Sequence, residues 1–341
     1  MSFACPLSRI QAKHITLAHG GGGKSTSDLI ENIFLPSFGT SKKDLHDGAY
    51  LSIGDSKLAF TTDSYVVQPL FFPGGTIGDL AVFGTVNDLA MCGARPLYLS
   101  CGFILEEGFE ISGLEKIVAS MERAAKISGV RLVTGDTKVV ERSRGDGVYI
   151  NTSGIGVVEM QGIRPQNIQS GDLIILNGDI GRHGIAVMTE REGLAFETSV
   201  ESDVCELYTL VKALQTSGVE IHCMRDLTRG GLATAIVELA QARGLSFEID
   251  EGQVPVVDSV RGVCEFLGLD PLYVACEGRM VVFVPPECGE QALAVMEAWG
   301  GAPRIIGKVS EDANSLVSLK TFMGTYRILD RLVGDQLPRI C

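Results

Sequence analysis

Five aspartates are the strongest candidates for functional residues, because of their type and their position in the sequence. They are Asp47 before Gly48, Asp63 after Phe60-Thr61-Thr62, Asp88 in an apolar stretch, Asp136 in Thr134-Gly-Asp-Thr-Lys138, and Asp226 in Met224-Arg-Asp-Leu-Thr-Arg-Gly-Gly231. Carboxylate oxygens are the protein ligands that Mg²⁺ prefers, and Mg²⁺ in turn binds nucleotide phosphates. Several such residues in one chain with a glycine-rich loop favour a site for a magnesium-bound nucleotide.

Asp88 is the most informative of these aspartates. Residues 77, 81, 84 and 88 recur at helical spacing, so Asp88 shares a stripe with Ile77 and Ala81. A carboxylate on an apolar stripe needs a partner. The partner is either a cation or an arginine such as Arg95, and for a lone aspartate the salt bridge is the commoner solution. Asp226 is similarly open to two interpretations, because it either caps the following helix or binds metal.

A run of glycines near the start of the chain forms a second candidate site. His19-Gly-Gly-Gly-Gly-Lys24 resembles the end of a P-loop, although Ala18 stands where the first glycine of that motif belongs. The backbone can wrap closely around an anion at Gly21, Gly22 and Gly23. Lys24 adds a positive charge at the N-terminus of the helix that follows. The alternative is a flexible glycine linker.

The chain ends on a cysteine, Cys341, after Pro338-Arg-Ile. Pro338 prevents helix formation, and a terminus of this kind is expected to be mobile. The adjacent α-carboxylate raises the pKa of the thiol and Arg339 partly offsets this, so nothing local marks Cys341 as an activated nucleophile. A thiol on a flexible arm suits a carrier better, while composition alone favours an accidental terminal cysteine.

Composition excludes several classes of protein. The formal net charge is -13 and no Lys/Arg run is long enough to neutralise several phosphates, so nucleic acid is not an expected partner. No stretch approaches the roughly 20 apolar residues of a spanning helix, so we expect no membrane association. The nine cysteines are odd in number, scattered and never spaced as Cys-x-x-Cys. They predict neither a disulfide framework nor structural zinc, which indicates the reducing cytoplasm.

The periodicity predicts helices and strands that alternate without a strict parallel unit, which favours an α+β fold. Expected helices cover 26–34, 77–92, 112–128, a segment from 184, 233–242, 260–267 and 290–299. Expected strands cover 50–53, 57–62, 97–104, 131–134, 147–158, 173–177, 247–249 and 280–284. Proline and glycine bracket polar residues between 160 and 171, where we place a domain boundary.

The motifs together resemble those of a known ATP-binding superfamily. Asp47-Gly-Ala, Thr61-Thr-Asp63, Asn87-Asp-Leu-Ala-Met-Cys-Gly-Ala-Arg-Pro96, Gly135-Asp-Thr-Lys138 and Asp226-Leu-Thr-Arg-Gly-Gly231 carry the resemblance. The superfamily includes aminoimidazole ribonucleotide synthetase, selenophosphate synthetase and thiamine-monophosphate kinase. Within it, the ending Pro338-Arg-Ile-Cys341 with His19-Gly-Gly is similar to the HypE family of hydrogenase maturation proteins.

The resemblance implies two α+β domains and a tail. Residues 1–160 would form an ATP-binding domain whose sheet builds a dimeric barrel with a second copy, residues 161–325 a C-terminal domain, and residues 326–341 a flexible tail. The metal-binding positions would be Asp47, Asp88 and Asp226. The positions near the nucleotide would be Gly21, Gly22, Gly23, Lys24, Asp63 and Asp136.

The resemblance also implies the chemistry: ATP and Mg²⁺ would serve to dehydrate a carbamoyl group carried on Cys341 to a thiocyanate. Lys138 and Glu277 are the implied acid–base residues, although from sequence alone they are more simply a surface lysine and a turn carboxylate. The implied partners are a second copy, the carbamoyltransferase HypF, and the HypC–HypD complex that receives cyanide for nickel–iron hydrogenase. Two alternatives are a thiamine-monophosphate-type kinase and a non-catalytic carbamoyl carrier. Whether the tail docks in the site stays open.

Overall fold

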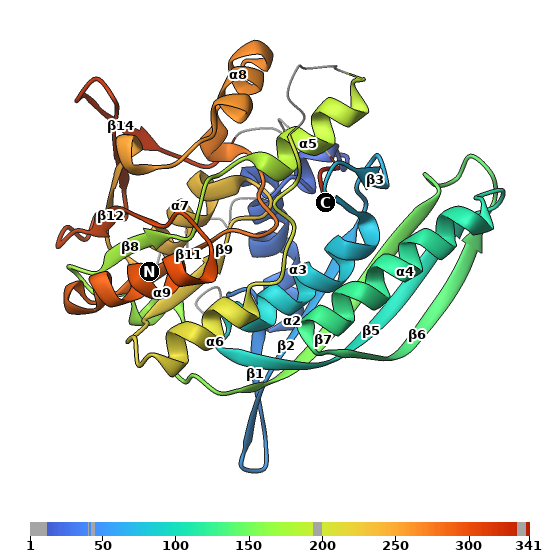
Figure 1. Ribbon diagram of the computed structural model, residues 1–341, viewed down its shortest axis with the longest axis horizontal. Coiled ribbons are helices and arrows are strands. Elements are labelled where there is room, and N and C mark those ends of the chain that lie inside the picture. Colours follow the sequence, from blue (N-terminus) through green and yellow to red (C-terminus); the bar gives the residue numbers. More distant parts are fainter. Residues whose placement is uncertain (1–11, 40, 42–44, 194–199, 333–338) are drawn as a thin grey trace, which may run out of the picture.

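The structure is a computed structural model that describes residues 12–39, 41, 45–193, 200–332 and 339–341 (Figure 1). All predicted site residues fall within these ranges. Most of the predicted flexible segment just before Arg339 lies outside the described residues. Two sheets, each accompanied by helices, lie side by side along the long axis of the molecule.

The first sheet has five strands in the order β1-β2-β7-β5-β6. Their bounds are β1 (Ala49–Ile53), β2 (Ser56–Tyr65), β5 (Ala94–Glu106), β6 (Arg131–Val140) and β7 (Val148–Val158). Strands β5 and β6 pair in parallel and the other neighbours pair antiparallel. Gly54 has a φ of 58°, which lets the two-residue turn between β1 and β2 close. In the single chain this sheet is open, with β1 and β6 at its edges.

Helices α3 (Ile77–Met91) and α4 (Ile111–Ser128) pack on one face of the first sheet (Figure 1). The hydroxyl of Thr76 begins α3 by accepting hydrogen bonds from Gly78 N and Asp79 N. Helix α3 contacts both the first sheet and strand β9 of the second one. It is therefore buried almost all round, and a polar residue near its end, such as Asp88, faces the junction between the two sheets.

The second sheet has seven strands in the order β14-β13-β10-β12-β8-β11-β9. Their bounds are β8 (Leu173–Leu176), β9 (Cys223–Asp226), β10 (Phe247–Asp250), β11 (Met280–Val284), β12 (Arg304–Val309), β13 (Val317–Lys320) and β14 (Tyr326–Leu329). The accompanying helices are α5 (Arg182–Arg191), α6 (Tyr208–Thr216), α7 (Gly231–Arg243), α8 (Asp258–Leu267) and α9 (Gly289–Trp299). Strand β11, which lies between β8 and the edge strand β9, is buried along its whole length.

Short elements complete the N-terminal part. They are the 3₁₀ turn η1 (Leu17–His19), α1 (Lys24–Leu29), the π-helical turn η2 (Ile30–Phe34), α2 (Leu35–Phe38), and the two-stranded ribbon of β3 (Phe71–Phe72) and β4 (Gly75–Thr76). Further 3₁₀ turns are η4 (Pro165–Asn167), η5 (Glu251–Gln253), η6 (Pro271–Tyr273) and η7 (Pro286–Cys288).

The α+β prediction is confirmed, and so are all predicted helices and strands, with end points that shift by a few residues. The strand predicted over 131–134 is longer, since β6 continues to Val140 beside β5. Helix α6 and strands β3, β4, β9, β12, β13 and β14 were not predicted. The assignment of 326–341 to a flexible tail is wrong at its start, because residues 326–329 form β14 and pair with β13.

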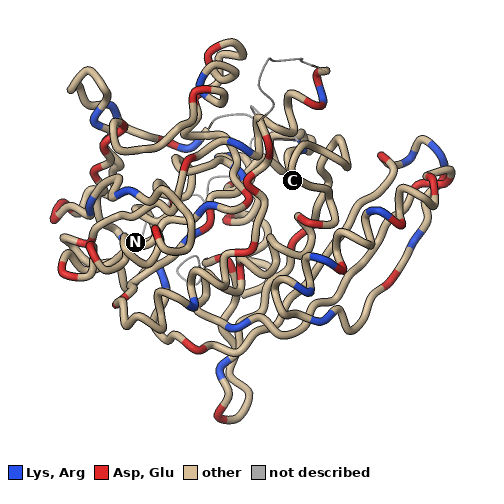
Figure 2. The backbone as a smooth tube through the Cα atoms, in the orientation of Figure 1, with Lys and Arg blue, Asp and Glu red and all other residues tan. Residues whose placement is uncertain are grey.

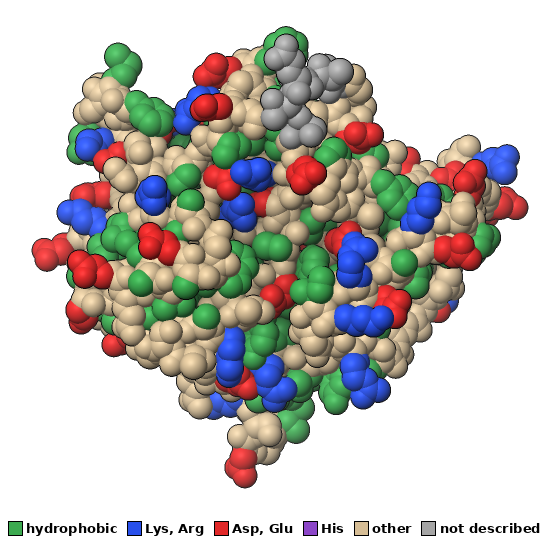
Figure 3. Space-filling model, viewed as in Figure 1, with side chains coloured by type: hydrophobic (Ala, Val, Ile, Leu, Met, Phe, Trp, Pro, Cys, Tyr) green, Lys and Arg blue, Asp and Glu red, His purple; other side chains and the backbone are tan. Residues whose placement is uncertain are grey.

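Charges of both signs are interspersed over the visible surface (Figure 3). Figure 2 shows acidic and basic residues following one another along the exposed strand β6. Within the described ranges, no helix has the length and apolar character needed to cross a bilayer.

Candidate active site

Three of the predicted aspartates converge at the junction of the two sheets. Asp47 precedes β1, Asp88 lies near the end of α3, and Asp226 ends β9. One ligand oxygen from each lies within 4.8 Å of those of the other two. Residues far apart in the sequence thus supply one group of carboxylates, as predicted for a metal site.

The alternative explanations for Asp88 and Asp226 do not apply. Arg95 pairs with Glu159 at 2.7 Å, and the Oδ2 atom of Asp88 instead accepts a hydrogen bond of 2.7 Å from Thr61 Oγ1. Helix α7 is capped by Gly230, without a side-chain cap. The Asp226 carboxylate is therefore available to the cluster.

The surroundings orient the cluster without neutralising it. Arg225 Nε lies 2.9 Å from Asp47 Oδ1. The other oxygen, Asp47 Oδ2, and Asp226 Oδ2 are buried and have no hydrogen-bond partner among the described residues. His46 Nδ1 is 3.4 Å from Asp47 Oδ2, but burial lowers the pKa of His46 and so favours its neutral form. Buried carboxylate oxygens that have no hydrogen-bond donor and no charged partner need a cation.

The pKa shifts of the clustered aspartates also indicate a cation site. Burial raises the pKa of Asp88 well above its ordinary value, and the charges of Asp226, Asp47 and Asp63 raise it further. Burial and Asp47 likewise raise the pKa of Asp226. Repulsion among carboxylates is relieved by a divalent cation, and all-oxygen ligands are those that Mg²⁺ takes. The donor set therefore fits Mg²⁺.

Asp63 lies on β2, beside this cluster. It is half-buried and faces α3, like Thr61 and Tyr65 on the same strand. Burial raises its pKa, whereas the charge of Arg229 lowers it. The charge of Asp63 helps to raise the pKa values of Asp88 and Asp226, so Asp63 lies close to the cluster. Its predicted place near the nucleotide stays a prediction.

The glycine loop packs on Arg229, the residue that follows Asp226-Leu-Thr. Arg229 Nη1 donates a hydrogen bond of 2.7 Å to Gly20 O. Gly22 has a φ of 76°, and a Cβ atom there would lie 3.0 Å from Arg229 Cβ and 3.1 Å from Arg229 O. A side chain at Gly22 would force the loop away. Gly23 caps α1 and Lys24 is exposed, so the loop borders the cluster with its lysine in solvent.

Cys341 is buried in the site rather than exposed on a tail, with only 8% of its surface accessible. Its backbone oxygen accepts a hydrogen bond of 3.0 Å from Val66 N, just after β2. Burial raises the pKa of the Cys341 thiol, and Glu277, Asp63 and Asp226 raise it further while Arg229 opposes them. The thiol is therefore held protonated, beside the acidic cluster. In this structure the last residue therefore lies inside the site, and the flexibility expected of the tail stays a prediction.

Glu277 lies in the loop before β11 and is 4% exposed. Its Oε1 atom has no hydrogen-bond partner among the described residues. Burial raises the pKa of Glu277 well above its ordinary value, and Asp226, Asp63 and Asp203 add to the shift. A carboxylate of raised pKa is a stronger base once it loses its proton. The structure thus brings Glu277 and Cys341 into one site.

The structure does not bring Asp136 and Lys138 to this site within one chain. Both lie on the edge strand β6, three strands from β2 in the sheet order, and Lys138 Nζ pairs with Asp136 Oδ2 at 2.6 Å. Register places Asp136 opposite Gly102, which is opposite Asn151 and then Ser64, on the sheet face away from Asp63. Their side chains are about 70% exposed. A role for either residue at Cys341 stays a prediction.

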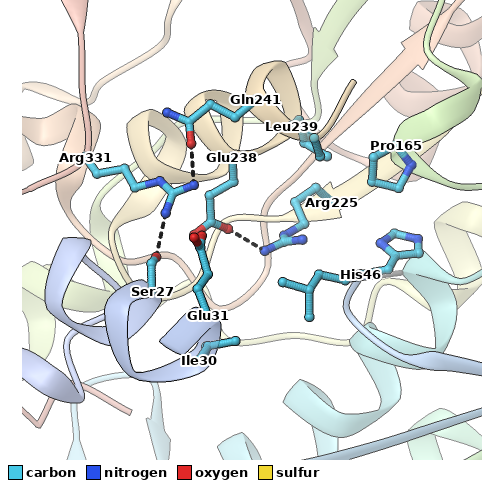
Figure 4. A pocket seen from close by; sticks show the side chains of 12 residues that line it. Ser27, Ile30, Glu31, His46, Pro165, Arg225, Glu238, Leu239, Gln241 and Arg331 are labelled. Carbon is cyan, nitrogen blue, oxygen red and sulfur yellow. Dashed lines mark hydrogen bonds and ion pairs between the residues drawn. The ribbon is translucent and has the colours of Figure 1, made fainter. Parts of the chain in front are cut away.

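A cavity of about 200 Å³ is lined by His46 and Arg225, which both contact Asp47 (Figure 4). Arg225 lines it and bridges Asp47 to Glu238, whose Oε2 is 2.8 Å from Arg225 Nη2. Arg331 spans the opposite side between Ser27 and Gln241. The aspartates do not line this cavity, but its wall fixes the position of Asp47.

Sequence reasoning missed Arg225 and Arg229 as site residues. Both lie within three residues of Asp226, so the motif pointed to their neighbourhood but not to their contacts. It also missed His183 and Arg191 on α5, which contact the end of the chain and which no motif marks.

Comparison with known proteins assigns both halves of the chain. Residues 45–158 match the N-terminal domain of AIR synthase related proteins, and residues 169–320 match the C-terminal domain. The carbamoyl dehydratase HypE of Azotobacter vinelandii is 46% identical over 98% of this chain and 100% of its own. A crystal structure of HypE in complex with ATP is 44% identical with a TM-score of 0.81, over 96% of this chain and 100% of that one. A HypE–HypF complex is 45% identical with a TM-score of 0.83, over 89% and 99%.

Proposed function

This chain belongs to the HypE family of carbamoyl dehydratases, and from that premise we propose that it uses ATP to dehydrate a carbamoyl group carried on its own Cys341. The observation that carries the proposal is the burial of the last residue, Cys341, among Glu277, Arg229 and the aspartates. A carrier that only presented its cargo to another protein would have no need to bury the thiol beside a candidate base and a metal cluster.

Asp47, Asp88 and Asp226 would hold Mg²⁺, which when bound would neutralise the phosphates of ATP. The relative solved in complex with ATP supports nucleotide binding. Gly22 lies against Arg229, and the backbone N–H groups of the glycines at 21–23 are suited to an anion. Lys24, whose side chain is exposed, would meet phosphate oxygens from the solvent side.

The reaction begins with a thiocarbamate, Cys341-S-C(=O)-NH₂, whose carbonyl oxygen is a poor leaving group. Transfer of the γ-phosphoryl group of ATP to this oxygen, with loss of one N–H proton, gives an O-phosphorylated C=N compound and ADP. Loss of phosphate as the C–O bond breaks, with removal of the second N–H proton, leaves Cys341-S-C≡N. The carbamoyl oxygen departs in the phosphate, so no free water is formed.

Glu277 is the residue best placed to take these protons. It shares the site with Cys341, and the raised pKa of its carboxyl makes its deprotonated form a stronger proton acceptor. Arg229 is the cation that acts most strongly on Cys341, since the charge of Cys341 is the leading cause of the raised pKa of Arg229. It would stabilise negative charge that develops near the sulfur and the phosphorylated oxygen.

Lys138 can serve the same reaction only from a second copy of the chain, because its own Cys341 lies beyond the opposite face of the sheet. A homodimer formed through the outer face of the first sheet, which carries Lys138, would put this residue at the contact with the second copy. Exposed apolar side chains on this face, including Phe60, Tyr98 and Ile104, support such an interface. Replacing Tyr98 and Ile104 together by arginine would then yield monomers in sedimentation analysis, whereas unchanged sedimentation would contradict this interface.

HypF would load Cys341, as the solved HypE–HypF complex of a relative suggests, and the HypC–HypD complex would accept the cyanide. Loading requires the end of the chain to leave its buried position. The described cysteines are free, in keeping with action in the reducing cytoplasm.

Two measurements test the proposal against its alternatives. ATP hydrolysis by carbamoylated protein should exceed that of unmodified protein, and equal rates would favour a mere carrier. Cys341→Ala should abolish thiocyanate formation and keep nucleotide binding. If that variant still transferred phosphoryl groups to a free small molecule at the wild-type rate, the chain would be a kinase.

A further inference from the structure

The last three residues lie in a groove whose first wall is the segment that follows β2. Val66 N donates to Cys341 O at 3.0 Å, and Gln68 N donates to Arg339 O at 3.3 Å. The two pairs run in opposite directions along the chain, as in an antiparallel ladder. Main-chain hydrogen bonds of this kind fix register and direction but do not distinguish one sequence from another.

Helix α5, which accompanies the second sheet, supplies the opposite wall. His183 Nε2 lies 2.8 Å from Ile340 O, and Arg191 Nη2 donates to Arg339 O at 2.6 Å. Arg191 Nε also donates to Gln68 O at 2.7 Å. Arg191 therefore contacts both the chain end and the opposite wall of the groove.

His183 is fully buried, and its hydrogen bonds define its role. Its Nδ1 atom lies 2.9 Å from Ser202 Oγ, which in turn accepts from Val204 N at 3.1 Å. The Ser202 hydroxyl thus donates to Nδ1, and the ring proton resides on Nε2, directed at Ile340 O. Burial lowers the pKa of His183, which favours this neutral form.

Side chains of the chain end add selectivity. Ile340 is 3% exposed and packs in the apolar cluster that contains Tyr65 and Val67. Arg339 pairs with Asp146 and donates from Nε to Val66 O at 3.2 Å. A basic residue, an apolar residue and a terminal cysteine therefore match the groove in that order.

We propose that His183 and Arg191 are positioning residues that clasp the backbone of residues 339–341 and hold Cys341 in the reaction site. The effect of these two residues on catalysis rests on the proposed function. Their binding of the backbone of residues 339–341, called the clasp below, does not depend on it. Neither side chain touches the reacting atoms. Each instead stabilises the docked chain end, so that the cargo on Cys341 faces Glu277.

The clasp has opposite effects on two rates. The docked thiol is buried, so an external reagent reaches it only in the released state, and weakening the clasp speeds that reaction. The intramolecular reaction needs the docked state, so weakening the clasp slows it. A residue that merely packs in the core would change the stability of the fold without this reciprocal pattern.

The test uses the full chain with His183→Phe, which keeps the ring contact with Phe72 but removes the donor, and His183→Gln, which keeps a donor. Arg191→Met removes the second donor. Arg182→Met is the matched control on the same helix, since Arg182 pairs with Asp179 and not with the chain end. Alkylation of Cys341 by iodoacetamide is followed by the mass of the peptide 335–341, released by cleavage before Asp335.

We expect His183→Phe and Arg191→Met to raise the alkylation rate of Cys341 about three- to tenfold, the range that one lost hydrogen bond produces. In a second measurement the protein is carbamoylated beforehand and a single turnover is followed. If release of the chain end from the groove competes with the reaction, the rate of thiocyanate formation should fall about three- to tenfold. The affinity for ATP should not change. His183→Gln should recover part of both effects, and Arg182→Met should change neither.

Unchanged alkylation in both His183→Phe and Arg191→Met would overturn the clasp, and either variant alone suffices if the other does not fold. Faster alkylation together with unchanged thiocyanate formation would overturn the positioning role. If the wild-type protein forms no thiocyanate at all while the alkylation pattern holds, the proposed function fails and the clasp stands.

Discussion

Arg225 Nε donates to Asp47 Oδ1 at 2.9 Å, while Asp47 Oδ2 is buried without a hydrogen-bond partner among the described residues. One oxygen of the carboxylate is thus fixed and the other is presented to the space shared with Asp88 and Asp226. A guanidinium cannot enter a metal's ligand sphere, so it orients the ligand without replacing the metal. The site is built for a cation that the side chains alone do not supply.

Removing one carboxylate should therefore stabilise the metal-free protein and abolish its response to metal. For Asp88→Asn we expect the free energy of unfolding without Mg²⁺ to rise by about 1–3 kcal/mol, because a repelled buried charge is lost. Mg²⁺ should raise the melting temperature of the wild type and leave that of Asp88→Asn unchanged. Glu190→Gln on α5 is the control. Equal stabilisation of wild type and Asp88→Asn by Mg²⁺ would contradict the site.

The same repulsion predicts a pH dependence. The pKa values of Asp88 and Asp226 are raised in the folded chain above the ordinary value of 3.8, so the unfolded chain loses its protons first as pH rises. Stability from these groups is present below about pH 3.8 and is lost as pH rises through the folded pKa values. Without Mg²⁺, urea unfolding should show the wild type losing stability relative to Asp88→Asn as pH rises above about 4. Parallel curves would contradict the repulsion.

Glu277→Gln should slow the dehydration step and spare nucleotide binding. The amide keeps the shape of the side chain but accepts no proton at neutral pH, so we expect single-turnover thiocyanate formation to fall about 10²- to 10⁴-fold. The measurement uses protein carbamoylated beforehand, with ATP affinity determined in parallel. Glu206→Gln, another buried carboxyl, is the control for a general effect of neutralising a buried acid. A loss of less than about threefold in Glu277→Gln would exclude it as the base.

Lys138 and Glu277 should complement each other across subunits. If Lys138 acts from a second copy, Lys138→Met and Glu277→Gln are each inactive, but mixing them after reversible dissociation creates heterodimers with one intact site. Random mixing should restore about a quarter of the wild-type rate, since half of the dimers are mixed and half of their sites are intact. No recovery, with heterodimers shown by mass, would mean that Lys138 does not act across the interface.

The residues alone marked Asp47, Asp88 and Asp226 as candidates, because each stands at the end of an element or on an apolar stripe. The family resemblance was needed to separate these three, which the structure brings together, from Asp63 and Asp136. The sequence did not predict on which face of the sheet Lys138 lies. Alternation along a strand assigns a residue to a face only when the register with the neighbouring strands is known. Sequence reasoning also missed β9, whose four residues include the charged pair Arg225 and Asp226. Four residues carry too little periodicity to distinguish a strand.

The end of the chain shows why local patterns fail at long range. Pro338, which lies outside the described residues, argues from the sequence against a helix and for a mobile end. The contacts that hold the last residues come from distant parts of the chain. Val66 N donates to Cys341 O over 275 residues, and His183 Nε2 on α5 lies beside Ile340 O over 157 residues. Such contacts depend on the tertiary arrangement of both sheets, which no spacing in the tail can encode.

The most direct measurement follows the carbamoyl oxygen. Cys341 is loaded with a carbamoyl group that carries ¹⁸O in its carbonyl, ATP is added, and both inorganic phosphate and the peptide 335–341 are weighed by mass spectrometry. Phosphorylation at the carbamoyl oxygen predicts phosphate that contains ¹⁸O and a peptide that has lost the mass of one labelled water. Unlabelled phosphate, or a peptide that keeps its label while ATP is consumed, would contradict ATP-dependent dehydration on Cys341.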